Sequence, residues 1–285
     1  MGETGVVTDY RDLEAIARDV AERCGRLIAD ERPNRLGVAN TKSSETDIVT
    51  VMDTRSEALA RELLRTARPD DGLFGEEGLD ETGSTGITWV VDPIDGTVNY
   101  LYDIPAYSVS VAAVEGDPRR PGEWRPVAGA VGCPRLDEVF HASLGGGAWL
   151  SSGGRTRELR PEPPMELAAS LLGTGFSYLA ATRVWQGALL ADLLSDVRDV
   201  RRMGSAALDM CYAAAGRLDV YYEHNLHAWD VAAAWLVASE AGLLVRGLTT
   251  PYPWEEMALV GRQAVVDVLA SRIGEWLGSE GVRLG

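Results

Sequence analysis

The order of apolar and polar positions along the chain predicts an alternation of helices and strands. Apolar residues recur every three or four positions in residues 9–32 and 54–67, which predicts two amphipathic helices. Residues 47–53 form a strand candidate between them. The short apolar runs 73–74 and 88–91 are each followed directly by acidic residues, a pattern typical of buried strands whose ends carry carboxylates.

The predicted order of secondary-structure elements changes near residue 160. Before this point the pattern predicts an antiparallel set of strands at 106–114, 127–132 and 138–142, followed by a turn and another strand within 145–150. After it, strands at 170–173, 199–202 and 220–222 alternate with helices at 181–191, 205–215, 229–241 and 262–277. Residues 160–165, with three prolines, mark the boundary. We therefore predict an α+β part at 1–160 and an α/β part at 161–285, joined in one compact unit.

Net charge and cysteine content restrict the partners and the cellular compartment that can be expected for this protein. The net charge is −16, which argues against a nucleic-acid partner. A site for phosphate would need local positive charge, and bound metal is the obvious source. The three cysteines form no CxxC pair, so we expect buried thiols in a reducing compartment. Neither a signal peptide nor an apolar run of about 20 residues is visible, which predicts a cytoplasmic protein without a membrane partner.

The segment DPIDGT at residues 92–97 is the sharpest chemical feature. Asp92 and Asp95 follow an apolar run, and a proline between them stiffens a turn on which both carboxylates can converge. Hard divalent cations prefer such oxygen ligands, and the Ile94 carbonyl is also placed to serve. The glycine that follows lets backbone N–H groups approach a phosphate. The alternative is an Asx-turn, in which the acids only bind local backbone.

Further acids support the metal interpretation. Glu76 and Glu77 follow another short buried strand, and Asp230 stands at the start of the helix predicted at 229–241. Taken alone, the two glutamates would be expected in a solvated loop. For Asp230, capping of the helix is an alternative role that is compatible with metal binding.

These residues together resemble the inositol monophosphatase family. The similar segments are WVVDPIDGT at 89–97, GEE at 75–77 and WDVAA at 229–233. The resemblance covers roughly residues 9–269 and also takes in KSS at 42–44, DIVTVMD at 47–53, GSAALD at 204–209, AGRLD at 215–219 and YYE at 221–223. It is strongest to bacterial inositol-1-monophosphatases. It implies a layered αβαβα fold, magnesium as cofactor, a homodimer and sensitivity to lithium.

The resemblance also implies a role for individual residues. Metal ligands would be the side chains of Glu76, Asp92, Asp95 and Asp230 and the carbonyl of Ile94. Glu76 and Thr97 would activate water, with Asp53 nearby. Substrate contacts would come from Gly96, Thr97, Val98, Gly204, Ser205, Ala206, Glu223 and Asp230, and Lys42 would lie on a mobile loop.

Two positions depart from the family pattern. The family often has a hydroxyl residue where Val98 stands, so a phosphate contact there would come from the backbone N–H. It often has glycine where Ala234 stands, and alanine is the better helix former. Neither change touches a predicted metal ligand.

The chemistry of phosphate esters agrees with this assignment. A monoester dianion repels an attacking hydroxide, and its hydrolysis releases an alkoxide; one metal ion can lower the pKa of a bound water and another can stabilise the leaving oxygen. No Ser, Cys or His nucleophile is required. His141, His224 and His227 form no triad with a serine elbow, and we expect them to be surface or structural residues. Direct attack by water, without a phosphoenzyme, is therefore predicted.

The substrate is less narrowly defined than the reaction. Inositol 1-phosphate is preferred, because Glu223 can accept hydrogen bonds from ring hydroxyls. Histidinol phosphate, whose amine Glu223 can also pair with, and fructose 1,6-bisphosphate stay open, whereas adenosine 3',5'-bisphosphate would need an adenine pocket that we cannot identify. A regulatory binding protein on the same fold is a further alternative. The glycines at 145–147 lack the GxGxxG spacing of a dinucleotide site.

Overall fold

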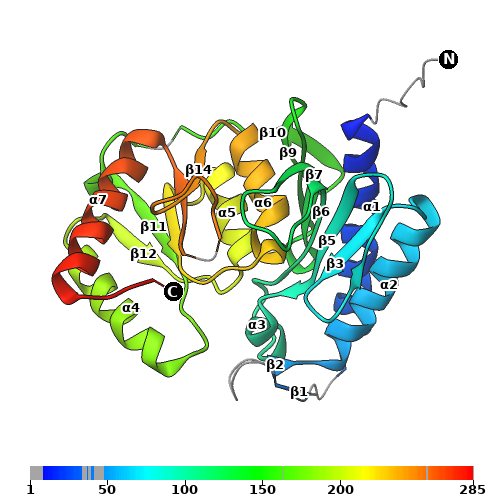
Figure 1. The fold of residues 1–285 in the computed structure, drawn as a ribbon, viewed down its shortest axis with the longest axis horizontal. Coiled ribbons are helices and arrows are strands. Elements are labelled where there is room, and N and C mark those ends of the chain that lie inside the picture. Colours follow the sequence, from blue (N-terminus) through cyan, green and yellow to red (C-terminus); the bar gives the residue numbers. More distant parts are fainter. Residues whose placement is uncertain are drawn as a thin grey trace.

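A computed structural model describes residues 9–33, 37, 40–41, 48–162, 164–254 and 256–284. Five layers follow one another across the molecule (Figure 1): a helical layer, a large sheet, a central helical layer, a smaller sheet and an outer helical layer. The predicted αβαβα sandwich is confirmed. Lys42 and its neighbours in the KSS segment lie outside the described residues.

The first helical layer consists of α1 (Tyr10–Asp30) and α2 (Val51–Ala67), which cover the outer face of the large sheet. The helical spacing places Leu13, Val20 and other apolar side chains of α1 in the core beneath. The strand predicted at 47–53 is wrong in extent. Among its described residues the strand covers just β2 (Ile48–Val49), which pairs with β1 (Asn40–Thr41). The strand stops there because Thr50 and Asp53 form a capping box that starts α2 at Val51.

The large sheet has the strand order β10-β9-β8-β7-β6-β5-β3-β4. Only β3 and β5 run parallel, and every other neighbouring pair is antiparallel. The strands are β3 (Gly72–Gly75), β4 (Asp80–Glu81), β5 (Ile87–Asp95), β6 (Ser108–Gly116), β7 (Trp124–Cys133), β8 (Glu138–Ser143), β9 (Gly147–Ser152) and β10 (Arg155–Glu158). Short helical segments follow β5 and β7, namely α3 (Thr97–Leu101) and η1 (Pro134–Leu136).

The central layer is formed by α5 (Ala206–Ala214) and α6 (Ala228–Glu240), which pack against both sheets. Both helices are rich in alanine, so they fit between two sheets without a polar face. A Cβ added at Gly129 of β7 would lie 2.9 Å from the Cα of Ala233, which shows how closely α6 approaches the sheet. The tight turn at Gly145–Gly147 holds the carboxylate of Glu240 through two backbone N–H groups, at 2.9 Å each.

The smaller sheet has the order β12-β11-β13-β15-β14 and is covered by α4 (Ala180–Leu193) and α7 (Gln263–Glu280). Its strands are β11 (Leu171–Thr174), β12 (Asp199–Arg201), β13 (Val220–Glu223), β14 (Leu244–Gly247) and β15 (Ala258–Gly261), and the short helix η2 (Leu167–Ala169) precedes them. The hydrophobic pattern did not predict β14 and β15. The division of the chain at residue 160 stays a prediction.

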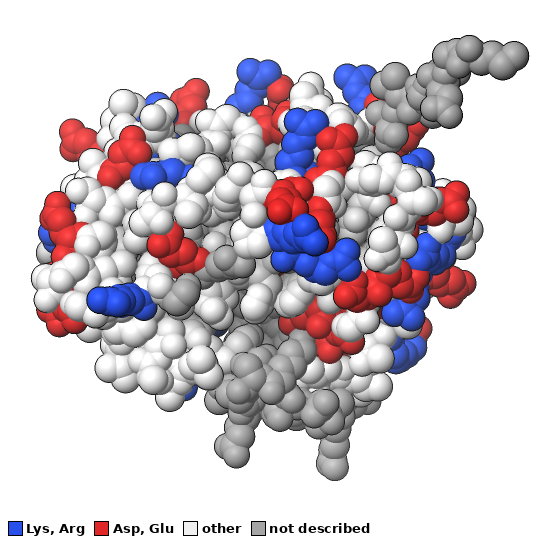
Figure 2. All heavy atoms as spheres, in the orientation of Figure 1, with Lys and Arg blue, Asp and Glu red and all other residues white. Residues whose placement is uncertain are grey.

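The surface mixes charges of both signs. On the face drawn in Figure 2, acidic and basic side chains are interspersed among the described residues. Arg65 and Arg61 both pair with Glu81, for example. The three cysteines are free and buried, as expected. Among the described helices, none combines the length and the apolar character needed to cross a membrane.

Candidate active site

A cavity of about 490 Å³ is formed by the segments that follow β5, β11, β12 and β13. Chain stretches from both sheets and from the start of the central helices therefore meet in one place. The described residues that line it include most of the predicted site: Glu76, Asp92, Ile94, Asp95, Gly96, Thr97, Gly204, Ala206, Glu223 and Asp230. Asp53, Val98 and Ser205 do not line it, although each is adjacent in sequence or structure to a residue that does.

Three carboxylates form the floor of the site. Each of Asp92, Asp95 and Asp230 offers one oxygen, and these three oxygens lie within 4.8 Å of one another. Asp92 is 1% exposed and Asp95 is 8% exposed. Residues three apart in a regular strand point to opposite faces, so the convergence of the first two needs an explanation.

An irregularity in β5 supplies that explanation. Asp92 pairs with Ser110 of β6 and Asp95 pairs with Ser108, so β5 takes three steps where β6 takes two. Such a bulge redirects the side chains of the strand that carries it. The acids lie at the end of the strand, as predicted, but β5 extends through Asp95, so a bulge within the strand and not a turn brings the two side chains together.

Glu76 reaches the same edge from the neighbouring strand. Gly75 of β3 is in register with Val91 of the parallel strand β5, which places Glu76 beside Asp92. The loop is held by Glu57, which accepts a hydrogen bond of 2.9 Å from the backbone N–H of Glu77. Sequence reasoning missed Glu57, although an acid on the apolar face of a predicted helix is a usable signal.

The backbone around the acids fixes their orientation. Asp95 accepts hydrogen bonds from the Ser205 hydroxyl (2.6 Å) and from the N–H groups of Ala206 (3.3 Å) and Ala207 (2.8 Å), at the beginning of α5. Asp230, in the first turn of α6, accepts from the N–H of His227 (2.6 Å). Both carboxylates thus lie at helix N-termini, where the helix dipole favours negative charge.

Burial dominates the electrostatics of the cluster. It raises the pKa of Asp92, and the charges of Glu76, Asp95 and Asp230 raise it further. Burial raises the pKa of Asp95 to about 6, although its hydrogen bonds with Ser205 and Ala207 act in the opposite direction. The pKa of Asp230 is likewise raised by burial, then by the charges of Asp95 and Glu76.

This donor set fits a divalent cation. Converging carboxylates repel one another in a poorly solvated site, and a hard cation removes that cost while taking oxygen ligands. Among the described residues that line the cavity, Arg202 is the only lysine or arginine, so side chains do not neutralise the cluster.

Thr97 links the acids to Asp53. Its hydroxyl lies 3.2 Å from Oδ1 of Asp53 and 3.0 Å from the carbonyl oxygen of Ile94, so it donates to one of these acceptors. Gly96 has φ of +93°, which favours glycine and brings Thr97 back over the bulge. Burial raises the pKa of Asp53 to about 7, against the hydrogen bonds from Thr50.

The far part of the cavity contains Glu223 at the end of β13. The hydroxyl of Tyr221 donates a 2.5 Å hydrogen bond to its Oε2 atom. A Cβ added at Gly175 would lie 2.0 Å from the carboxylate, so Glu223 rests directly on that glycine. Burial raises the pKa of Glu223 to about 7, while Tyr221 and the charge of Arg202 act to lower it.

The histidines divide into two groups. His141 is structural, as expected, because it bonds Glu14 (2.6 Å) and Ser151 (3.1 Å) between α1 and the sheet. His224 and His227, however, line the acidic cavity. They lie just before the first turn of α6, which contains Asp230. Their position in the cavity depends on the tertiary fold, so it could not be predicted from the local sequence.

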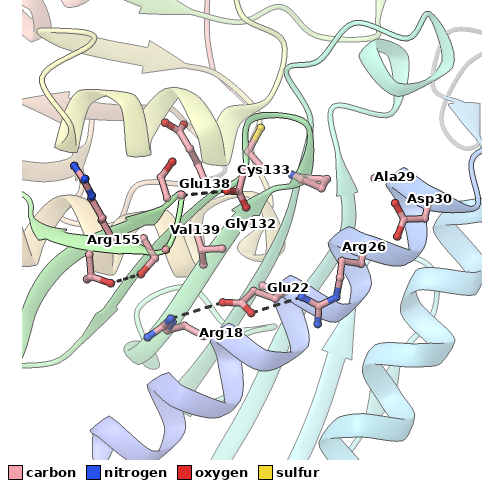
Figure 3. Close-up of a pocket in the computed structure, with 18 residues that line it drawn as sticks. Arg18, Glu22, Arg26, Ala29, Asp30, Gly132, Cys133, Glu138, Val139 and Arg155 are labelled. Carbon is pink, nitrogen blue, oxygen red and sulfur yellow. Dashed lines mark hydrogen bonds and ion pairs between the residues drawn. The ribbon is translucent and has the colours of Figure 1, made fainter.

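A second cavity, of about 390 Å³, lies between α1, β8, β9 and β10 (Figure 3). Its charged side chains have both signs and pair with one another, for example Glu22 with Arg18 (3.7 Å) and with Arg26 (3.8 Å). The acidic cavity holds the one cluster of three metal-competent side chains found among the described residues. It is therefore the candidate active site.

Fold and site define an αβαβα sandwich with a carboxylate-lined cavity between its sheets. The model of the inositol monophosphatase family matches residues 9–272. The solved structure of Mycobacterium tuberculosis SuhB superimposes with a TM-score of 0.80 at 38% identity, covering 97% of this chain and all of that one. The chain belongs to the inositol monophosphatase family.

Individual relatives have two kinds of name. The inositol-1-monophosphatase of Mycobacterium leprae is 49% identical over 253 residues, which cover 84% of each chain. The Nus factor SuhB of Pasteurella multocida is 40% identical over 234 residues, which cover 81% of this chain and 83% of the relative.

Proposed function

We propose that this protein is a magnesium-dependent phosphomonoesterase that hydrolyses inositol 1-phosphate to inositol and phosphate. The convergence of Asp92, Asp95 and Asp230 within 4.8 Å is the observation that carries the proposal. Similarity to the Mycobacterium leprae inositol-1-monophosphatase supports the choice of substrate.

The metal ligands would be the carboxylates of Glu76, Asp92, Asp95 and Asp230 and the carbonyl of Ile94. Bound magnesium ions would supply activation of water and neutralisation of charge on the phosphate and the leaving oxygen. The bulge in β5 and the two helix starts hold these donors before any ion arrives, so little reorganisation is needed on binding.

Thr97 and Glu76 would prepare the attacking water. The Thr97 hydroxyl donates to Asp53 or to the Ile94 carbonyl, which leaves its lone pairs to accept a hydrogen bond from water. Glu76 would take the proton that the water loses. The resulting hydroxide would form the new bond to phosphorus as the ester P–O bond breaks, and the inositol oxygen would leave with the bonding electron pair and take up a proton, with no covalent phosphoenzyme.

The substrate would lie between the acids and Glu223. The backbone N–H groups of Gly96, Thr97 and Val98 would contact phosphate oxygens, and Lys42 would approach from its loop. Asp230, Glu223, Gly204 and Ala206 would contact the polyol. Ser205 would act indirectly, because its hydroxyl is bonded to Asp95.

A substrate panel tests this proposal. Phosphate release is measured from inositol 1-phosphate, histidinol phosphate, fructose 1,6-bisphosphate and adenosine 3',5'-bisphosphate, each with magnesium and with EDTA. We expect inositol 1-phosphate to have the highest kcat/KM and EDTA to abolish turnover. Should inositol 1-phosphate be the slowest of the four, the assigned substrate is wrong.

Three further properties belong to the same proposal. We expect a homodimer, a cytoplasmic location and inhibition by lithium, as the family resemblance implies. Sedimentation analysis, cell fractionation and a lithium titration of the magnesium-dependent rate test them separately.

A role with the transcription machinery is the second candidate, favoured by the relative named Nus factor SuhB. The two functions separate in an Asp95→Asn variant. Magnesium-dependent phosphate release should be lost, and a cellular phenotype that this variant still complements would assign that phenotype to binding rather than to hydrolysis.

A further inference from the structure

Among the described residues that line the acidic cavity, one lysine or arginine side chain lies with several carboxylates. Within its described lining, Arg202 faces a set of five carboxylates: Glu76, Asp92, Asp95, Glu223 and Asp230. Arg202 follows β12 and precedes the Gly204 turn that leads into α5. Neither the metal cluster nor the water-activating pair uses it, so its function is unassigned.

The guanidinium of Arg202 is available to a ligand. Arg202 is an exposed residue, and its guanidinium makes no hydrogen bond with the described part of the chain. A Cβ added at Gly204 would lie 2.6 Å from its Nη1 atom, so the glycine leaves the space that the guanidinium occupies. The neighbouring Arg201 differs, since it is paired with Asp199 at 2.7 Å on the surface.

The charge of Arg202 acts on two carboxyl groups near this end of the cavity. These are Glu223 and Asp209 of α5, and the charge acts to lower the pKa of each against the larger effect of burial. Asp209 is 1% exposed, and its Oδ1 atom has no hydrogen-bond partner among the described residues. A buried carboxyl group of this kind favours a nearby cation.

Glu223 and Arg202 together offer complementary groups to a ligand. Oε2 of Glu223 is bonded to Tyr221, which leaves Oε1 as the free acceptor. Arg202 contributes only donors. A hydroxyl group can donate to Glu223 and accept from Arg202 at the same time, whereas a protonated amine can satisfy only the carboxylate and is repelled by the guanidinium.

We propose that Arg202 is a specificity-determining residue, which selects phosphate esters of neutral polyols and discriminates against esters that carry a protonated amine. This inference rests on the proposed phosphatase function and deepens it. According to this inference, the charge of Arg202 lets the enzyme distinguish inositol 1-phosphate from histidinol phosphate. Both an attractive and a repulsive element contribute to such a preference.

The test compares the wild type with Arg202→Gln on three esters with magnesium: inositol 1-phosphate, histidinol phosphate and 4-nitrophenyl phosphate, which has neither hydroxyls nor an amine. Loss of one charged hydrogen bond should raise KM for inositol 1-phosphate about tenfold or more. The kcat/KM for histidinol phosphate should rise, and 4-nitrophenyl phosphate should change by less than about twofold, which also reports an intact fold and metal site.

Two further variants sharpen the comparison. Arg202→Lys keeps the charge and should keep the discrimination against the amine while losing part of the affinity for inositol 1-phosphate. Arg201→Gln removes an adjacent surface charge and should match the wild type on all three esters. Equal loss on all three esters in Arg202→Gln, or an unchanged KM for inositol 1-phosphate, overturns the inference.

Failure of the proposed function gives a different result. If the wild type releases no phosphate from inositol 1-phosphate, the assigned reaction is wrong whatever the variants do, and the specificity assigned to Arg202 is overturned with it. If the wild type is active and Arg202→Gln is indistinguishable from it, only the assignment of Arg202 is lost.

Discussion

The Ser205 hydroxyl donates a hydrogen bond of 2.6 Å to Oδ2 of Asp95, although 110 positions separate the two residues. Asp95 belongs to the large sheet, and Ser205 caps α5 in the central layer. The bond therefore ties the main acidic segment to the start of a central helix. Because Ser205 does not line the cavity, its effect on any ligand passes through Asp95.

Replacing Ser205 by alanine tests this connection. Ser205→Ala leaves one oxygen of Asp95 with fewer donors, so we expect the affinity for magnesium to fall by about ten- to hundredfold. Calorimetric titration with magnesium measures the change. Ser205→Thr retains a hydroxyl and should recover much of the affinity. Wild-type affinity in the alanine variant would mean that Asp95 is held sufficiently by backbone N–H groups alone.

The Thr97 hydroxyl is expected to matter for turnover rather than for binding. Thr97→Val keeps the shape but removes the group that bonds Asp53 and the Ile94 carbonyl, so kcat should fall about a hundredfold or more while KM changes little. Thr97→Ser should retain most of the rate. Steady-state kinetics on inositol 1-phosphate measure both parameters, and a mainly KM effect would assign Thr97 to substrate binding instead.

Gly175 is expected to control the position of Glu223. In Gly175→Ala the new Cβ would meet the carboxylate at 2.0 Å, so Glu223 must move, and KM for inositol 1-phosphate should rise about tenfold. Gly187→Ala in α4 is the matched control, because apart from the adjacent backbone of its own helix no heavy atom of the described residues lies within 4 Å of the added Cβ. It should raise the free energy of unfolding by about 0.5–1 kcal/mol and leave KM unchanged.

Glu14, which lies outside the candidate active site, should make the free energy of unfolding depend on pH. Burial acts to raise its pKa, but hydrogen bonds with His141 and Ser143 (both 2.6 Å) outweigh burial and hold the pKa below its ordinary value of 4.5. The charged form is thus favoured in the folded state. Its stabilising contribution is present above pH 4.5 and is lost as the pH falls through the lowered pKa.

Glu14→Gln should therefore lower the free energy of unfolding by about 1–2 kcal/mol at pH 7. The difference from the wild type should shrink as the pH falls below 4.5. Urea unfolding at several pH values measures it. The control is Asp19→Asn on the same helix, whose exposed pair with Arg23 should contribute less than about 0.5 kcal/mol. A difference that stays constant down to the lowest pH would contradict the argument.

Local signals predicted much of the fold. Apolar spacing located α1, whose observed bounds lie within two residues of the expected ones. The same approach failed at Val51, because Thr50 and Asp53 cap a helix where β-branched residues indicated a strand. It also missed β14 and β15, which are four residues each. β15 pairs with β13 and β14 pairs with β15, so both depend on pairing across the sheet rather than on a pattern of their own.

Site residues could be predicted from the sequence where an acidic residue stands at a characteristic position, such as the end of an apolar run or the start of a helix. Acids that follow apolar runs indicated Glu76, Asp92 and Asp95, and a helix start indicated Asp230. The bulge between Asp92 and Asp95 depends on pairing with β6, so no local pattern reveals it. Arg202 lines the cavity through the folding of β12 beside β11, which a single sequence does not encode in any short segment.

The central claim is that the buried carboxylates bind divalent cations, and magnesium titration of Asp92→Asn tests it most directly. The surface variant Glu123→Gln, whose acid is exposed, serves as the control. We predict that the wild type and Glu123→Gln bind magnesium alike and that Asp92→Asn binds it about tenfold more weakly or not at all. Equal magnesium binding by Asp92→Asn and the wild type would contradict the account.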